Sequence, residues 1–183
     1  MSKILIDTDP GIDDAMAILL AAASPELEIV GVTTLFGNNP DVPLLTRNAL
    51  GLLHLAGRDD VPVAQGALKA LRPLREPTGK AVHGDNGLGD APLDPATRAA
   101  ETIAADHFIV DLSNRYGDAL TLVTLAPLTN IANALVIDPQ LASRTPKLSM
   151  MGGAALRSGN ATPTAEANIL NDPHDSPLAL IRN

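Results

Sequence analysis

Four aspartates lie close together directly after a short apolar segment at the start of the chain. Residues 7–14 read DTDPGIDD and contain Asp7, Asp9, Asp13 and Asp14. Like charges at such spacing repel one another, so the folded chain must hold something that compensates them. Free N–H groups at a helix start offer partial positive charge, and a bound divalent cation offers more. Because carboxylate oxygens suit hard ions, the cluster predicts a Ca²⁺ or Mg²⁺ site rather than a zinc site.

Three other interpretations fit parts of this run. Helix capping needs one aspartate and leaves the others unexplained. An EF-hand loop does not fit, because Gly11 comes one place early and Ile18 stands where the bidentate glutamate belongs. A phosphatase with a nucleophilic aspartate in a D-x-D turn fits Asp7 and Asp9, and it gives no role to the Asp13-Asp14 pair. The phosphatase therefore stays as an alternative hypothesis.

Segments of strand and helix character alternate along the rest of the chain. Strands are expected at 3–6, 27–34, 61–64, 119–125 and 147–151, and helices at 15–23, 42–56, 97–115, 128–136 and 173–181. This alternation predicts one α/β domain over residues 1–183 with a mostly parallel sheet. Ligands bind beyond the carboxyl ends of the strands in such sheets. The aspartates, Asn38 and the segment from Gly152 onward are therefore expected to form one composite site.

Residues 66–96 are rich in Pro, Gly and charge, and a long irregular stretch of this kind is usually functional. His83 in this stretch is expected to form a structural hydrogen bond, and Asn130 is also expected to be structural.

Composition narrows the class of protein. The chain has 183 residues, 45% of them hydrophobic and 2% aromatic, so the core is expected to be Leu, Ile, Val and Ala. The absence of cysteine excludes disulfides and thiolate metal sites. A net charge of −8 without a basic cluster argues against a nucleic-acid partner. Apolar runs too short to span a membrane, together with no secretory leader, favour a cytoplasmic protein.

The run DTDPGIDDAMAI resembles the signature of the inosine-uridine-type nucleoside hydrolases. Further segments agree in order and spacing: TTLFGN (33–38), TRNAL (46–50), AQG (64–66), HGDNGLG (83–89), LAPLTNIA (125–132), MMGG (150–153), and GNATPTAEANI with NDP (159–173). The resemblance covers nearly the whole chain. It implies a doubly wound α/β fold, hydrolysis of ribonucleosides to ribose and free base in nucleoside salvage, Ca²⁺ as cofactor, and a homo-oligomer in the full-length family.

The resemblance also assigns roles to individual residues. Asp9 and Asp14 would ligate Ca²⁺ through their carboxylates, and Leu125 would do so through its main-chain carbonyl. Asp13 would be the general base acting on a calcium-bound water, with Asp7 supporting the cluster. The ribose would be held or lined by Asn38, Met151, Asn160, Glu166 and Asn168. Acidic and amide oxygens suit this chemistry, because breaking the C1′–N bond builds positive charge on the ribose.

Two departures from the family pattern bear on the expected activity. Ala167 stands where many members carry Phe, which is expected to alter contacts with the base. The family's C-terminal region, which supplies a further Asp ligand and usually a His that protonates the leaving base, has no counterpart here. The chain is therefore expected to be C-terminally truncated relative to the family. A catalytically inactive calcium- and ribose-binding fragment is accordingly the main alternative to an active enzyme.

Overall fold

A parallel β-sheet forms the centre of the protein. The structure, a computed structural model, describes residues 1–72 and 79–174; residues 175–181 of the helix expected at 173–181, and part of the irregular stretch, lie outside the described residues. The strands are β1 (Ser2–Thr8), β2 (Leu27–Thr34), β3 (Val63–Gln65), β4 (Leu120–Thr124) and β5 (Lys147–Met150). They pair in the order β3-β2-β1-β4-β5, and every pairing is parallel. The predicted α/β class with a mostly parallel sheet is confirmed.

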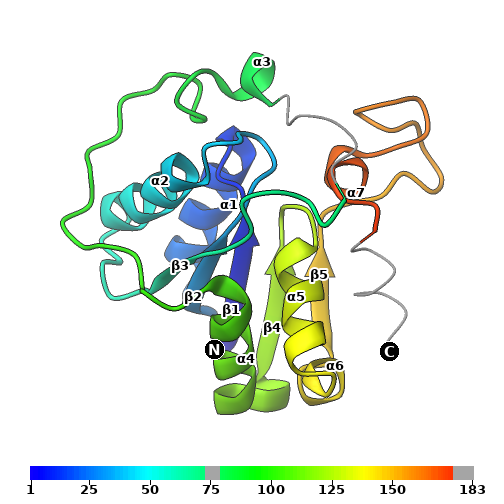
Figure 1. Ribbon diagram of the computed structural model, residues 1–183. Helices are drawn as coiled ribbons and strands as arrows, with labels where there is room; N and C mark the ends of the chain where they lie inside the picture. Colours follow the sequence, from blue (N-terminus) through cyan, green and yellow to red (C-terminus); the bar gives the residue numbers. More distant parts are fainter. Residues whose placement is uncertain (73–78, 175–183) are drawn as a thin grey trace.

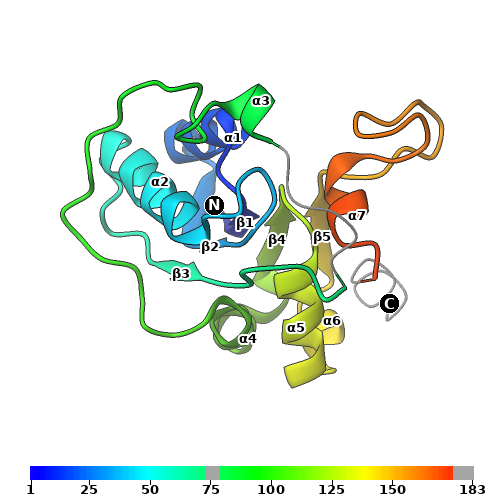
Figure 2. The ribbon, with the colours of Figure 1, turned by 45° about the horizontal axis from the view of Figure 1, so that its top comes forward.

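Helices cover both faces of this sheet. They are α1 (Ile12–Ala23), α2 (Val42–Leu55), α3 (Lys80–His83), α4 (Ala105–Tyr116), α5 (Thr129–Ile137), α6 (Leu141–Arg144) and α7 (Ala167–Asn171), with a 3₁₀ turn at Gly117–Ala119. Figures 1 and 2 show α1 and α2 on one face and α4, α5 and α6 on the other. In β1, Ile4 and Ile6 pack in the core on the α1–α2 side, whereas Leu5 packs on the α4–α5 side. This alternation within one strand produces the doubly wound arrangement.

The helix expected at 97–115 begins at Ala105, so its first eight predicted positions were wrong. Tertiary hydrogen bonds explain the difference. The main-chain N–H of Glu101 donates to the carbonyl of Val63 at 2.8 Å, and the Arg98 guanidinium donates to the carbonyls of Asp59 and Val61. Residues 98–101 therefore run beside β3 and cannot coil into a helix.

The strand order places the acidic run at a switch point in the topology. The chain leaves β1 toward β2 on one side, and it reaches β4 on the other side only after β3 and α4. Asp7, near the carboxyl end of β1, pairs in register with Thr33 of β2 and Thr124 of β4. Loops that diverge from such a point leave a crevice, which is where ligands bind in open α/β sheets.

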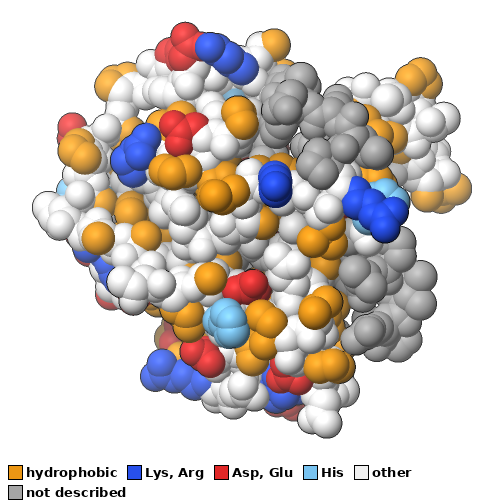
Figure 3. All heavy atoms as spheres, viewed as in Figure 1, with side chains coloured by type: hydrophobic (Ala, Val, Ile, Leu, Met, Phe, Trp, Pro, Cys, Tyr) orange, Lys and Arg blue, Asp and Glu red, His pale blue; other side chains and the backbone are white. Residues whose placement is uncertain are grey.

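None of the helices in the described part of the chain is long and apolar enough to cross a membrane. On the face shown in Figure 3, Lys and Arg side chains lie at separate places, interspersed with acidic and hydrophobic ones.

Candidate functional site

Asp7 is buried at the carboxyl end of β1. Its Oδ1 accepts hydrogen bonds from Thr33 Oγ1 at 2.6 Å and Asn130 Nδ2 at 2.8 Å, while its Oδ2 is buried without a partner. Burial raises the pKa of Asp7 from 3.8 to about 7, and the two hydrogen bonds oppose this rise. An ionised Asp7 therefore needs a compensating charge nearby.

Asp9 and Asp14 are also buried, and Asn38 joins them. The Asn38 main-chain N–H donates to Asp9 Oδ2 at 2.6 Å, and its Nδ2 donates to the carbonyl of Asp9 at 2.9 Å and to Asp14 Oδ2 at 3.3 Å. Asp14 also accepts from Thr8 Oγ1 at 2.5 Å and from the Gly11 N–H at 3.0 Å. Burial raises the pKa of both carboxyls, and for Asp9 the charge of Asp14 adds to the rise.

These carboxylates fit a hard cation by their chemistry. Asp9 and Asp14 are oxygen donors whose burial and mutual repulsion oppose ionisation, and a bound cation would reverse that effect. In residues 1–72 and 79–174, no group of three or more Asp, Glu, His or Cys side chains is arranged to hold a metal ion. Asp9 and Asp14 could supply carboxylate ligands, and the remaining ligands of a Ca²⁺ ion would be carbonyl and water oxygens, which Ca²⁺ accepts.

Asp13 differs from its neighbours because its side chain is exposed. Its side chain is 74% exposed, and His83 Nδ1 lies 3.9 Å from Asp13 Oδ1. Asp13 therefore lies at the rim of the acidic turn, in the first turn of α1. The structure does not bring it together with Asp9 and Asp14 by hydrogen bonds.

Asn168 forms hydrogen bonds to residues on the β4–β5 side of the site. Its Nδ2 donates to the carbonyl of Leu125 at 2.8 Å and to the carbonyl of Met151 at 3.1 Å, and lies 3.2 Å from Met151 Sδ. The Leu125 N–H donates to the carbonyl of Asp7 at 2.8 Å. The main chain of Leu125 thus connects the acidic turn to Asn168. The aspartates predicted to bind metal and the Asn168 predicted to bind ribose therefore lie at one edge of the sheet.

Glu166 and Asn160 shape the short helix that carries Asn168. Glu166 is buried at the N-cap of α7, where Oε1 accepts from the Asn168 N–H at 2.9 Å and Oε2 from the Ile169 N–H at 3.2 Å. The Gly153 N–H, just after β5, also donates to Oε2 at 3.3 Å. Asn160 Oδ1 accepts from the Ala167 N–H at 2.8 Å. Both predicted ribose ligands therefore bond to the main chain around α7 in this structure.

Sequence reasoning did not place several partners of the acidic residues. Thr8 and Thr33 bond to Asp14 and Asp7, and Asn130, which was expected to be structural and is so here, bonds to Asp7. The threonines at the ends of β1 and β2 were a usable signal, because polar residues that end buried strands face the crevice. Asn130 gave no such signal, since 123 residues separate it from Asp7.

Gly37 permits the close contact between its own backbone and Asp9. A Cβ atom at this position would lie 1.8 Å from Asp9 Oδ2. We expect Gly37→Ala to displace the Asp9 carboxylate, to lower the free energy of unfolding by about 1–3 kcal/mol, and to abolish stabilisation by Ca²⁺. Urea unfolding with and without Ca²⁺ measures both effects. Gly57→Ala is the control: it introduces a side chain at a φ of 67° in open space, so it costs stability but leaves the Ca²⁺ effect intact. Equal Ca²⁺ stabilisation in both variants would contradict the placement of Asp9.

The raised pKa of Asp7 predicts how stability depends on pH without metal. A carboxyl whose folded pKa exceeds its unfolded pKa stabilises the fold while protonated, and this contribution is lost as pH rises through the folded value. For Asp7 this loss occurs between about pH 4 and about pH 7, and the free energy of unfolding falls by about 4 kcal/mol in total. We expect the metal-free chain to lose unfolding free energy across this window, and Asp7→Asn to lose less. Denaturant titrations at a series of pH values test this. Identical pH slopes for the two proteins would show that Asp7 does not titrate as described.

Comparison with known proteins identifies extensive similarity. Residues 4–176 match the family model described as inosine-uridine preferring nucleoside hydrolase. The chain is 47% identical to uridine nucleosidase 1 of Arabidopsis thaliana over 171 residues, which is 93% of this chain and 51% of that protein. Among solved structures, a plant nucleoside hydrolase (PpNRh1) matches with a TM-score of 0.91 and 42% identity, covering 97% of this chain and 56% of that one.

A second solved structure agrees with the first. The purine-preferring ribonucleoside hydrolase from Gardnerella vaginalis matches with a TM-score of 0.92 and 37% identity, covering 96% of this chain and 56% of that chain. The chain therefore spans about half the length of the curated relatives and solved structures that it matches.

Proposed function

The chain belongs to the inosine-uridine preferring nucleoside hydrolase family, and from this premise we propose that it takes part in hydrolysis of the N-glycosidic bond of ribonucleosides. The products would be ribose and a free base. Relatives named as a uridine nucleosidase and as non-specific ribonucleoside hydrolases support this reaction. The cytoplasmic location and the homo-oligomer stay predictions of the sequence.

One structural observation supports the proposal in addition to family membership. Asn38 bridges the buried carboxyls of Asp9 and Asp14, and the Leu125 main chain connects this acidic turn to Asn168. Carboxylate, carbonyl and amide groups from three separate segments therefore meet at one edge of the sheet. This is the donor set that a hard cation and a polyhydroxylated ligand such as ribose require.

Asp9, Asp14 and the Leu125 carbonyl would hold the cation. When bound, Ca²⁺ supplies positive charge that compensates the carboxylates and makes a coordinated water more acidic, less strongly than Zn²⁺ does. The Asn168 amide, which donates to the Leu125 carbonyl at 2.8 Å here, would then turn toward ligand oxygens.

Asp13 would accept the proton of the attacking water. Its carboxylate is exposed in the first turn of α1, one residue before Asp14, where it would accept a proton from a water held by the cation. The water oxygen forms a bond to C1′ as the C1′–N bond breaks, and the base departs with that electron pair and takes up a proton from solvent. Oxygen atoms around the ribose stabilise the positive charge that develops on the sugar ring.

Amide and carboxylate groups would also select ribose over deoxyribose. Asn38 and Asn168 each carry a side-chain donor and acceptor, and a missing 2′-hydroxyl would leave such groups unpaired. We therefore propose ribonucleosides as the substrate class, with no assignment of the base.

A second candidate function is binding of a cation and ribose without hydrolysis. Two observations favour it: Asp13 forms no hydrogen bond to the buried carboxylates, and no group of three or more Asp, Glu, His or Cys side chains in the described residues is arranged to hold a metal ion. This candidate uses the same cation site and differs only in chemistry.

Release of ribose separates the two candidates. The 183-residue chain is incubated with Ca²⁺ and with inosine or uridine, and reducing sugar is measured against a chelator-treated control. Calcium-dependent sugar release supports hydrolysis. If calorimetry shows binding of Ca²⁺ and ribose but neither nucleoside releases sugar, hydrolysis is contradicted and binding without hydrolysis is supported.

A further inference from the structure

Asp172 is a buried carboxylate that the proposed reaction does not use. It directly follows α7, the short helix that carries Asn168, and it is completely buried. We propose that Asp172 is a positioning residue: it fixes the C-terminal end of α7 to α5 and to the segment after β3, and thereby holds Asn168 at the edge of the proposed ribose site. The inference rests on the proposed binding of ribose by Asn168.

Both hydrogen bonds of the Asp172 side chain come from distant parts of the chain. Its Oδ2 accepts the main-chain N–H of Leu71 at 2.6 Å, from 101 positions away, and the Thr129 hydroxyl at 3.0 Å, from 43 positions away. Leu71 lies in the segment after β3, and Thr129 is the first residue of α5. One carboxylate therefore joins three segments that follow three different strands, β3, β4 and β5.

The helix α7 depends on such anchors because it is short. Its five residues form little more than one helical turn, and isolated helices of this length are not stable in water. At the N-terminal end, Asn160 Oδ1 accepts the Ala167 N–H and Glu166 accepts the Gly153 N–H. At the other end, Asp172 lies four positions after Asn168. Loss of its two bonds would therefore loosen the turn that carries Asn168.

The segment after β3 gives Asp172 a fixed partner. Figures 1 and 2 show this segment passing the start of α5 towards α7. The Ala67 N–H donates to Asn130 Oδ1 at 3.0 Å, and Ala70 is buried in a hydrophobic cluster. The N–H of Leu71 thus comes from a segment that is bonded and packed against the body of the protein, and Asp172 transmits that support to α7.

The second oxygen of Asp172 shows which substitutions are informative. Oδ1 is buried without a hydrogen-bond partner among the described residues, so both bonds fall on Oδ2. Asparagine has nearly the same shape, and its carbonyl oxygen can accept both donors from the position of Oδ2. Its amide nitrogen then takes the unpartnered place, which costs stability but keeps the anchor. Asp172→Asn therefore retains the two bonds, whereas Asp172→Ala removes them.

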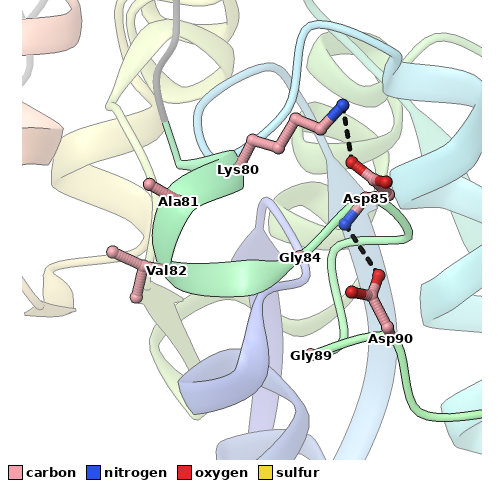
Figure 4. Close-up of a pocket in the computed structure, with 7 residues that line it drawn as sticks. All are labelled: Lys80, Ala81, Val82, Gly84, Asp85, Gly89 and Asp90. Carbon is pink, nitrogen blue, oxygen red and sulfur yellow. Dashed lines mark hydrogen bonds and ion pairs between the residues drawn. The ribbon is translucent and has the colours of Figure 1, made fainter.

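Burial distinguishes these bonds from the exposed ones in the loop at α3. In Figure 4, Lys80 reaches Asp85 across 2.5 Å, and Asp90 Oδ1 accepts the Asp85 N–H at 2.8 Å. The side chains of Lys80 and Asp85 are 71% and 76% exposed, so water screens their charges and the pair contributes little to stability. Asp85→Asn therefore controls for the loss of one negative charge.

Calorimetric titration of ribose in the presence of Ca²⁺ measures the effect on Asn168. We expect Asp172→Ala to weaken ribose binding by about tenfold, as for loss of one well-placed hydrogen bond, and to leave Ca²⁺ binding within about twofold. Asp172→Asn and Asp85→Asn should bind ribose as the unsubstituted chain does. Thr129→Val removes only one of the two bonds and should weaken ribose binding by about threefold, so it keeps the test available if Asp172→Ala does not fold.

Thr145→Val is the control matched for stability. It removes a buried hydroxyl that donates to Ser113 Oγ at 3.0 Å and to the Gly117 carbonyl at 3.3 Å, before β5 and therefore at the opposite end of that strand from the site. This variant should lose stability and keep its affinity for ribose. If Asp172→Ala also loses stability and keeps its affinity for ribose, Asp172 has only a structural role and the proposal is overturned.

Two other results would decide the inference. Equal weakening of ribose binding by Asp172→Asn and Asp172→Ala would overturn it, because the charge rather than the anchor would then be the cause. Absence of ribose binding by the unsubstituted chain would contradict the assigned role of Asn168 and overturn the inference with it. The titration needs no turnover, so absence of sugar release from a ribonucleoside would contradict hydrolysis and leave this test valid.

Discussion

Replacement of Asp13 by asparagine is expected to lower the rate of ribonucleoside hydrolysis by about 10²–10⁴-fold while Ca²⁺ binding persists. The reason is geometric. Asp13 lies at the exposed rim of the turn, whereas the carboxyls proposed to hold the cation are buried below it. Its removal therefore deprives the attacking water of a base and leaves the cation ligands in place. Sugar release under saturating substrate, combined with calorimetric titration of Ca²⁺, measures the two properties separately.

A matched control for this substitution exists on α4. Asp106 also lies in the first turn of a helix, so Asp106→Asn removes the same favourable interaction with a helix N-terminus. It lies in the helix layer on the opposite face of the sheet and should retain full activity. If Asp13→Asn and Asp106→Asn hydrolyse a ribonucleoside at equal rates, Asp13 is not the general base.

Asp14→Asn is expected to abolish stabilisation by Ca²⁺. A ligand that binds only the folded chain stabilises it by about 2.7 kcal/mol at one hundred times its Kd, and this increment should disappear when the carboxylate becomes a neutral amide. Asp14 is central to the site, because Thr8, Gly11 and Asn38 all donate to it and hold both of its oxygens in place. Thermal unfolding across a range of Ca²⁺ concentrations measures the increment.

Asp111 on α4 provides the comparison for Asp14. It is exposed and lies on the other face of the sheet, so Asp111→Asn changes the net charge equally without touching the acidic turn. The Ca²⁺ increment should be unchanged in this variant. A similar increment in the Asp14→Asn and Asp111→Asn chains would mean that Ca²⁺ acts through general screening rather than through this site.

Much of the fold could be predicted from the sequence because its main elements have strong local signals. The bounds of β2 at 27–34 agree with the β-branched run, and α2 follows the helical spacing of Leu and Ala. Three short helices were missed, α3 and α6 with four residues each and α7 with five, because such lengths show no helical period. The start of α4 was wrong because tertiary hydrogen bonds hold residues 98–101 beside β3.

The residues of the candidate site could be predicted from the sequence better than the hydrogen bonds that they form. Asp9, Asp14 and Asn38 meet as expected, since Asp9 and Asp14 follow the carboxyl end of β1 and Asn38 follows that of the neighbouring parallel strand β2. Glu166 was expected to bind ribose, and here it caps α7 and accepts three main-chain N–H groups, a role that depends on a helix missed from the sequence. The expected structural hydrogen bond of His83 is confirmed, but its partner Ile12 lies 71 positions away and could not be named without the fold.

Calorimetric titration of Ca²⁺ into the metal-free chain near neutral pH tests the central claim most directly, that the buried carboxyls of Asp9 and Asp14 share a hard cation. We expect one ion per chain, and loss of the binding heat in Asp9→Asn. A titration without binding heat, together with a melting temperature that Ca²⁺ does not change, would contradict this account.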